Sequence, residues 1–157
     1  MKKKIIGIAI VIVIMLGLIL VVYNQIIPDE YVPAADEIAS HIQLDTEEDV
    51  GLLVYDYCAD QHEYSGGISN ADGSLIKHDS DNIVVWSKEE LNSLSDTLGL
   101  SIQFRIITEY VAPNYENVYP DEITKYMEPI SWEAHCGESY FITITGDKTN
   151  GYKAVLN

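Results

Sequence analysis

The chain has 157 residues and a formal net charge of −16, with 25 acidic residues against nine lysines and arginines. Nucleic acids and anionic lipid head groups are bound by clusters of Lys and Arg, so this charge excludes nucleic acid as a partner. All of the acidic residues follow Pro28. Their surplus favours solubility, and a second interpretation is that it attracts cations or a basic partner.

The segment from Ile5 to Val22 has no charged or strongly polar side chain. A helix of this length reaches about 27 Å, close to the thickness of the hydrocarbon core of a bilayer. The lysines at positions 2–4 precede it, and such residues stay on the cytoplasmic side. The sequence therefore predicts a basic cytoplasmic segment at residues 1–4 and a single-pass transmembrane anchor at residues 5–23. The protein is expected in the cell membrane of a bacterium, with the rest of the chain outside.

A cleavable secretory signal begins in the same way, so it is the alternative to an anchor. Signal peptides have an apolar core of about 7 to 15 residues and a cleavage site soon after it. Here the apolar run is longer, and the nearest acceptable site, Val32–Ala34, lies well past its end. We therefore prefer an uncleaved anchor over cleavage to a free secreted protein.

Residues 24–49 are predicted to form a juxtamembrane stalk. Pro28 and Pro33 prevent the anchor helix from continuing. Apolar residues at helical spacing predict a short amphipathic helix between Ala34 and Leu44. An acidic run then leads into an extracytoplasmic domain at residues 50–157.

This domain has the pattern of an antiparallel β protein, because short apolar runs alternate with turn residues. Gly66 and Gly67 interrupt one of these runs and predict a bulge or a close approach of the backbone. The turn at Gly146–Gly151 predicts a hairpin at the end of the chain. The clearest strands are expected at residues 50–58, 61–69, 83–86, 101–112, 141–145 and 152–156. In the run 101–112, Ile102, Phe104 and Ile106 fall on alternate positions, which predicts a half-buried strand.

Two short helices are expected between the strands. Ser87 and Glu90 have the spacing of a capping box, which predicts a helix through Leu94. Residues 121–126 are predicted to form one or two helical turns. An antiparallel β-sandwich is the preferred fold, and the alternative is an α+β fold with both helices packed on an antiparallel sheet.

Tyr140 follows Gly137 by three positions, at the start of the penultimate expected strand. This pattern resembles the tyrosine corner of immunoglobulin-like β-sandwiches. The resemblance implies an immunoglobulin-like ectodomain. It is confined to the end of the chain and departs from antibody domains, because Cys136 precedes the tyrosine here whereas the second cysteine follows it there.

Cys58 and Cys136 are the two cysteines of the chain. A pair of cysteines in an exported domain is a candidate disulfide. On the chain-entropy account, a bridge that closes a loop of this length would stabilise the fold by about 4 kcal/mol. The alternative is two unpaired thiols that behave as small hydrophobic side chains.

Acidic residues in the turns are the candidate metal ligands. Asp72, Asp79, Asp81 and Asp147 lie in turns rich in Asp and Asn, and carboxylate and carbonyl oxygens are the ligands that Ca²⁺ prefers. None of these turns has the spacing of an EF-hand, and turn formation also explains their composition. Calcium is the one candidate cofactor, and the histidines show no spacing typical of zinc ligands.

The chain shows no pattern typical of catalysis. His135 and Cys136 are adjacent, and adjacent strand residues point to opposite faces, so they do not form a base–nucleophile pair. Tyr115 and Tyr119 lie between Pro113 and Pro120, and exposed tyrosines are common on recognition surfaces. The sequence predicts a non-enzymatic module that binds a protein or cell-envelope partner, with an envelope enzyme or a structural spacer as alternatives.

Overall fold

The computed structural model describes residues 31–157, in which the chain forms nine strands and no helix. The strands are β1 (Glu37–Thr46), β2 (Leu52–Ala59), β3 (His62–Ile68), β4 (Asp81–Ser87), β5 (Thr97–Ile107), β6 (Thr124–Tyr126), β7 (Ile130–His135), β8 (Ser139–Asp147) and β9 (Gly151–Leu156). The predicted mainly β class is confirmed for this part of the chain.

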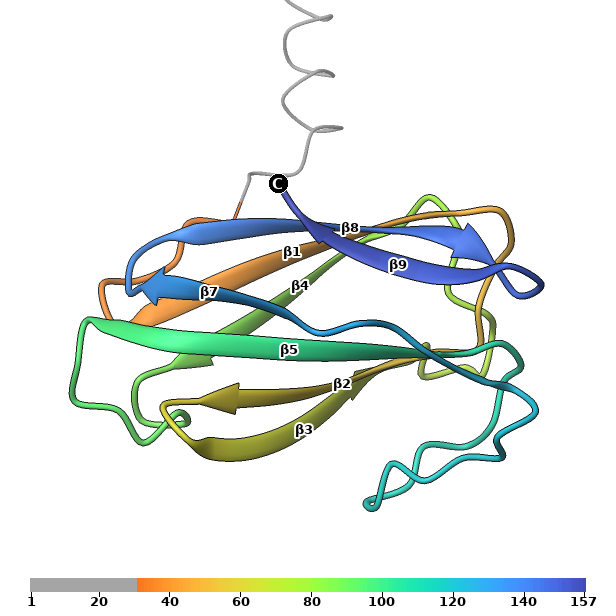
Figure 1. The fold of residues 1–157 in the computed structure, drawn as a ribbon, viewed down its shortest axis with the longest axis horizontal. Coiled ribbons are helices and arrows are strands. Elements are labelled where there is room, and N and C mark those ends of the chain that lie inside the picture. Colours follow the sequence, from red (N-terminus) through yellow and green to blue (C-terminus); the bar gives the residue numbers. More distant parts are fainter. Residues whose placement is uncertain (1–30) are drawn as a thin grey trace, which may run out of the picture. The chain divides into compact units, whose positions relative to one another are not determined.

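The strands form two sheets (Figure 1). The first sheet has four strands in the order β4-β1-β8-β9. The second has five strands: β3, β2 and β5 are neighbours, and β5 also pairs with β6 and β7. All pairings are antiparallel except that of β1 with β8. Since β1 pairs with β4 and β8 rather than with β2, the order is not that of immunoglobulin constant domains.

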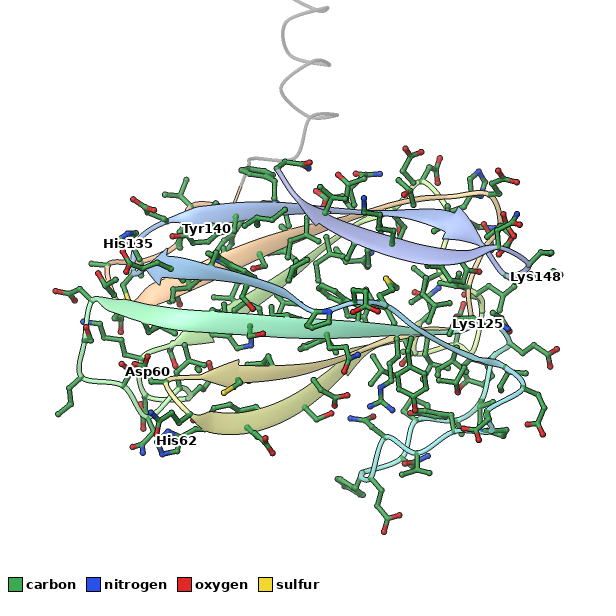
Figure 2. The ribbon with its side chains drawn as sticks, in the orientation of Figure 1. Asp60, His62, Lys125, His135, Tyr140 and Lys148 are labelled. Carbon is green, nitrogen blue, oxygen red and sulfur yellow. The ribbon has the colours of Figure 1, made fainter. Side chains whose placement is uncertain are left out.

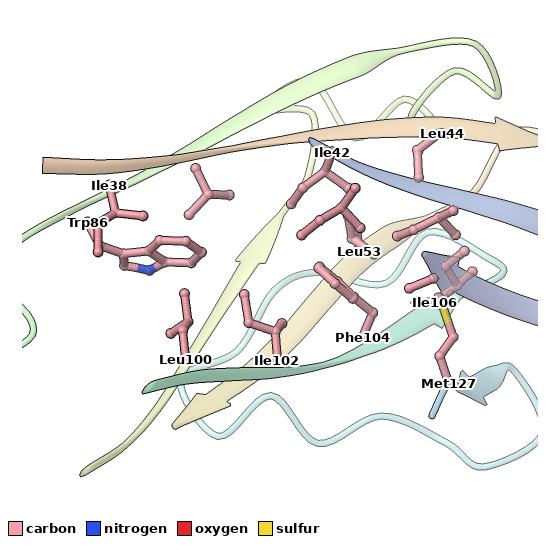
Figure 3. Close-up of a cluster of buried hydrophobic side chains, with 14 of the residues drawn as sticks. Ile38, Ile42, Leu44, Leu53, Trp86, Leu100, Ile102, Phe104, Ile106 and Met127 are labelled. Atoms are coloured by element: carbon pink, nitrogen blue, oxygen red, sulfur yellow. The ribbon is translucent and has the colours of Figure 1, made fainter. Parts of the chain in front are cut away.

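Side chains from the facing sides of the two sheets form a shared hydrophobic core (Figure 3). Ile42 of β1 and Phe104 of β5 are at most 1% exposed and both belong to it. The predicted alternation in β5 is confirmed: Ile102, Phe104 and Ile106 point into the core. The intervening residues of this strand therefore point to the outer face of the second sheet.

The predicted stalk and its helix are wrong for residues 37–46, because these form β1, an inner strand of the first sheet. Ile38, Ile42 and Leu44 all belong to the hydrophobic core, and their even spacing puts them on one face of a strand. Hydrogen bonding to β4 on one side and β8 on the other overrides the local helical spacing. The compact unit described by the structure begins at Val32 rather than at residue 50.

The predicted basic segment and anchor, residues 1–23, lie outside the described residues. Within residues 31–157, no helix has the length and apolar character needed to span a bilayer.

The two predicted short helices are not formed. Ser87 N donates to Glu90 Oε2 at 2.9 Å and Glu90 N donates to Ser87 Oγ at 3.2 Å, so the capping box itself is present. The residues after it make only turns. A short helix needs an apolar face that packs against the rest of the protein. Here Leu91 is buried but Leu94 is fully exposed, so such a face is missing. Residues 121–126 likewise form a turn followed by β6.

Two hairpins have well-defined turns. The predicted hairpin at the end of the chain is confirmed as β8–β9, where Asp147 Oδ1 accepts hydrogen bonds from the backbone of Thr149 at 2.6 Å and Asn150 at 2.8 Å. β2 and β3 are joined by Asp60 and Gln61, whose φ angles are 46° and 77°. Two successive positive φ angles are typical of the tight turns that suit the twist of a hairpin.

Candidate functional site

The outer face of the second sheet is polar. The register places Asp56 of β2 opposite Ser65 of β3 and Gln103 of β5. In the next outward-facing row, Cys58 lies opposite Glu63 and Ser101. The row continues to Ser131 of β7, which pairs with Ser101.

One end of this face is covered by the connection between β5 and β6, which we call the Thr108–Ile123 loop (Figure 1). Its base is closed by Thr108, whose backbone N and Oγ1 both donate to Ile123 O, at 2.9 and 3.2 Å. Tyr119 is 8% exposed and packs in a small cluster with Leu52, Val54 and Ile107. Closed ends and an internally packed side chain are the features of an Ω-loop, a class that is frequently functional.

Arg105 joins the loop to the sheet. Its Nη2 lies 2.9 Å from Asp56 Oδ2, and its Nη1 donates to Asn117 O at 3.0 Å. The guanidinium also lies over the ring of Tyr126, 5.6 Å from the ring centre. The Arg105 side chain is 10% exposed. A guanidinium offers several donors in a rigid plane, so one side chain holds a strand and a loop together.

Asn117 extends this network to β3. Its Nδ2 donates to Ser65 Oγ at 2.9 Å, and Ser65 Oγ donates to Asp56 Oδ1 at 2.8 Å. Asn117 itself has a φ of 49°, a left-handed conformation that Asn tolerates better than most residues. Asn114 Oδ1 accepts a hydrogen bond from Val118 N at 3.3 Å, and Asn114 Nδ2 donates one to Val118 O at 3.1 Å. The tip of the loop therefore has a defined shape.

The two predicted recognition tyrosines have different environments. Tyr115 is fully exposed at the tip of the loop, whereas Tyr119 is buried against the sheet. Tyr115 is therefore available to a partner, and Tyr119 supports the loop from below. Asp56, Ser65 and Asn117 carried no recognisable signal in the sequence, since only the strand register brings them together.

A shallow groove runs along the outer face beside the loop. One part of about 570 Å³ is lined by residues that include Glu63, Ser65, Gln103 and Pro129. A second part of about 520 Å³ includes Asp60, Gly99, Ser131 and Trp132. Cys58 and Ser101 line both parts, so the two are adjacent, and we call them together the outer-face groove.

The candidate disulfide is not formed, because Cys58 and Cys136 are both free thiols. Cys58 lines the outer-face groove, whereas Cys136 packs against the core between the sheets. The two thiols therefore lie on opposite faces of the second sheet. Burial raises the pKa of the Cys136 thiol, which keeps it protonated.

The candidate calcium ligands are not brought together, and within residues 31–157 no group of three His, Cys, Asp or Glu side chains is placed to hold a metal ion. Asp72 Oδ1 accepts from Ser74 N at 2.9 Å, and Asp147 caps its own turn. Asp81 Oδ2 lies 3.8 Å from His41 Nδ1, and Asp79 lies in the exposed turn before it. Turn formation accounts for Asp72 and Asp147.

Asp49 forms a charged cluster at another corner. Lys77 Nζ and His78 Nδ1 each lie 2.7 Å from its carboxylate, and His78 N donates to it at 3.0 Å. These hydrogen bonds hold the pKa of Asp49 well below its usual range. The carboxylate in turn raises the pKa values of Lys77 and His78. The cluster fixes the start of the second sheet and lies outside the groove.

The Tyr140 hydroxyl bonds a backbone group a few residues upstream, as the hydroxyl of a tyrosine corner does. It accepts from His135 N at 2.8 Å and donates to Glu138 Oε2 at 3.0 Å. Figure 2 labels Tyr140 and His135, which lie near each other. The hydroxyl thus ties the start of β8 to the end of β7. Because the strand order differs from that of immunoglobulin domains, the similarity is local to this corner.

No protein-family model and no curated protein matches the chain. Among solved structures, a structure of pneumolysin is similar, with 8% identity and a TM-score of 0.39. A structure described as a trapped toxin has 8% identity and a TM-score of 0.35. Each similarity covers 77% of this chain and 23% of the other, so the chain spans about a quarter of their length. Scores this low establish neither a shared fold nor a shared function.

Proposed function

We propose that this chain is a non-enzymatic binding module, a β-sandwich held outside a bacterial cell by its N-terminal apolar segment. It recognises a protein partner of the cell envelope through the Thr108–Ile123 loop. The observation that carries the proposal is that a fully exposed tyrosine, Tyr115, stands on a loop tied to the sheet by the buried side chain of Arg105.

A loop fixed in this way is suited to binding. Tyr115 and Val118 are exposed by 109% and 68%, and neither belongs to the small cluster that holds Tyr119. Because the loop is already ordered, a partner that covers Tyr115 loses little conformational entropy on binding. Tyrosine adds large contact area and a hydrogen-bonding hydroxyl with few rotatable bonds.

Photo-cross-linking from the full chain in its native membrane tests this function. A photoreactive phenylalanine analogue replaces Tyr115 in one variant and Leu94 in a matched control, since Leu94 is also fully exposed but lies in a different loop. We expect one defined adduct from position 115, absent from position 94 and competed by the unmodified protein. The same adducts from both positions, or none from position 115, would favour a structural spacer.

The anchor is tested separately. We expect the full chain to stay with the membrane during alkaline carbonate extraction, with its C-terminus accessible to a protease added outside the cell. Replacing Ile5–Val22 with a cleavable signal should release the protein into the medium. Release of the unmodified protein would contradict the anchor and leave the binding surface unaffected.

A further inference from the structure

The outer-face groove has no free cation. Among the lysines and arginines of residues 31–157, Arg105 alone lies in the outward-facing rows of the second sheet, and it is paired with Asp56. Lys125 of β6 pairs with Ile106 and so shares the inward-facing row. The exposed carboxylates of Asp60 and Glu63 therefore make the groove electronegative.

The groove also offers hydrogen-bond acceptors that are unpaired within the described residues. Gln103 lines the groove and uses its Nε2 to donate to Met127 O at 3.0 Å, and its side-chain oxygen makes no hydrogen bond within residues 31–157. The hydroxyls of Ser65 and Ser131 donate to Asp56 and Ser101, both at 2.8 Å. The Glu63 carboxylate makes no hydrogen bond or ion pair within residues 31–157. A ligand that brings donors is therefore complementary to these acceptors.

The shape of the groove selects for an extended ligand. Its two parts lie side by side at Cys58 and Ser101, and both are open to the surface rather than closed cavities. Ammonium and guanidinium groups carry donors and no acceptors, so they complement Asp60, Glu63 and Gln103. We propose that the outer-face groove binds an extended polypeptide segment that bears Lys or Arg side chains.

This site is separate from the tip of the loop, so it goes beyond the proposed function and is independent of Tyr115. The Lys or Arg side chains of the bound segment reach Glu63 in one part of the groove and Asp60 in the other. Charge-assisted hydrogen bonds to these carboxylates stabilise the complex. Attraction by the acidic surface raises the association rate of the positively charged segment. Binding should therefore weaken as salt is added.

Fluorescence anisotropy with the full chain in detergent micelles tests the inference. The probe is a labelled peptide of alternating Ser and Lys residues, and the control peptide has Gln in place of every Lys. We expect Glu63→Gln to weaken binding of the Lys peptide by about tenfold. Glu116→Gln removes the same charge from the exposed tip of the loop and should leave the affinity within about twofold of that of the unmodified protein.

Alkylation of Cys58 locates the bound peptide. In a Cys136→Ser background Cys58 is the single thiol, and we expect the Lys peptide to slow its alkylation by maleimide. Unchanged alkylation would overturn the proposed site, as would equal binding of the Gln peptide. Equal losses in Glu63→Gln and Glu116→Gln would show attraction by net charge only, which also overturns it. Tyr115→Ala should not change peptide binding, so this site and the proposed function can fail separately.

Discussion

Arg105 Nη2 and Asp56 Oδ2 lie 2.9 Å apart on the outer face of the second sheet, although the two residues are 49 positions apart in the chain. The side chain of Arg105 is 10% exposed and that of Asp56 is 44% exposed. Because Arg105 also donates to Asn117 O, this ion pair joins two strands to the Thr108–Ile123 loop. The loop therefore takes its position from a contact that the strand register creates.

Removal of the Asp56 charge should loosen the loop. We expect Asp56→Asn to lower the free energy of unfolding by about 1–3 kcal/mol, because it leaves a largely buried guanidinium without its counter-charge. Urea unfolding measures the loss, and limited proteolysis should show faster cleavage between Thr108 and Ile123. A double-mutant cycle with Arg105→Met supplies the control. A coupling energy near zero would show that the pair does not hold the loop.

Gly66 should be intolerant of a side chain. A Cβ at this position would lie 2.5 Å from the ring of Tyr55, so the ring would have to leave its place against the core. We expect Gly66→Ala to lower the free energy of unfolding by about 1–3 kcal/mol. Gly67→Ala is the matched control, because its Cβ would lie 3.5 Å from the nearest atom. Equal urea midpoints for the two variants would contradict this explanation.

The tyrosine corner should contribute to stability through a single hydroxyl. Tyr140→Phe removes the acceptor of His135 N and leaves that backbone group unpaired in a half-buried position. We expect a loss of about 1–2 kcal/mol in the free energy of unfolding. Tyr115→Phe, at the exposed tip of the loop, should have no measurable effect. If both variants unfold at the same urea concentration as the unmodified protein, the corner bond is not stabilising.

The Asp49 cluster should make stability depend on pH through His78. The pKa of His78 is raised by Asp49, so the charged form is favoured in the folded state. The stabilisation is complete below the unfolded pKa of about 6.5 and is lost as the pH rises through the higher folded value. We therefore expect His78→Gln to lower the urea midpoint more at about pH 5.5 than at about pH 8.5. An equal effect at both pH values would contradict the charged contact.

The turn between β2 and β3 should be improved by glycine. Gln61 has a φ of 77°, a conformation that costs a residue with a Cβ about 1 kcal/mol and costs glycine little. We expect Gln61→Gly to raise the free energy of unfolding by about 0.5–1 kcal/mol. Gln61→Ala controls for loss of the side chain and should bring no gain. The melting temperatures of the two variants, measured by circular dichroism, decide between these outcomes.

Several elements were determined by the sequence alone. The alternation of Ile102, Phe104 and Ile106 predicted a strand with one face in the core, and the structure buries all three. The turn residues at Gly146–Gly151 predicted the last hairpin, which β8 and β9 form. Gly66 was predicted to be a site of close approach, and it lies directly against the ring of Tyr55. These features depend on residues within a few positions of one another, so local periodicity and backbone preference are sufficient.

Only the tertiary structure decided the rest. Residues 37–46 have helical spacing, yet they form an inner strand because β4 and β8 pair with both of their edges. The register of β2 against β5 brings Asp56 to Arg105 on the outer face, and it separates Cys58 from Cys136. These outcomes depend on which distant segments become neighbours. A slip of one residue would turn every side chain of a strand to the opposite face, so the candidate site exists only through that pairing.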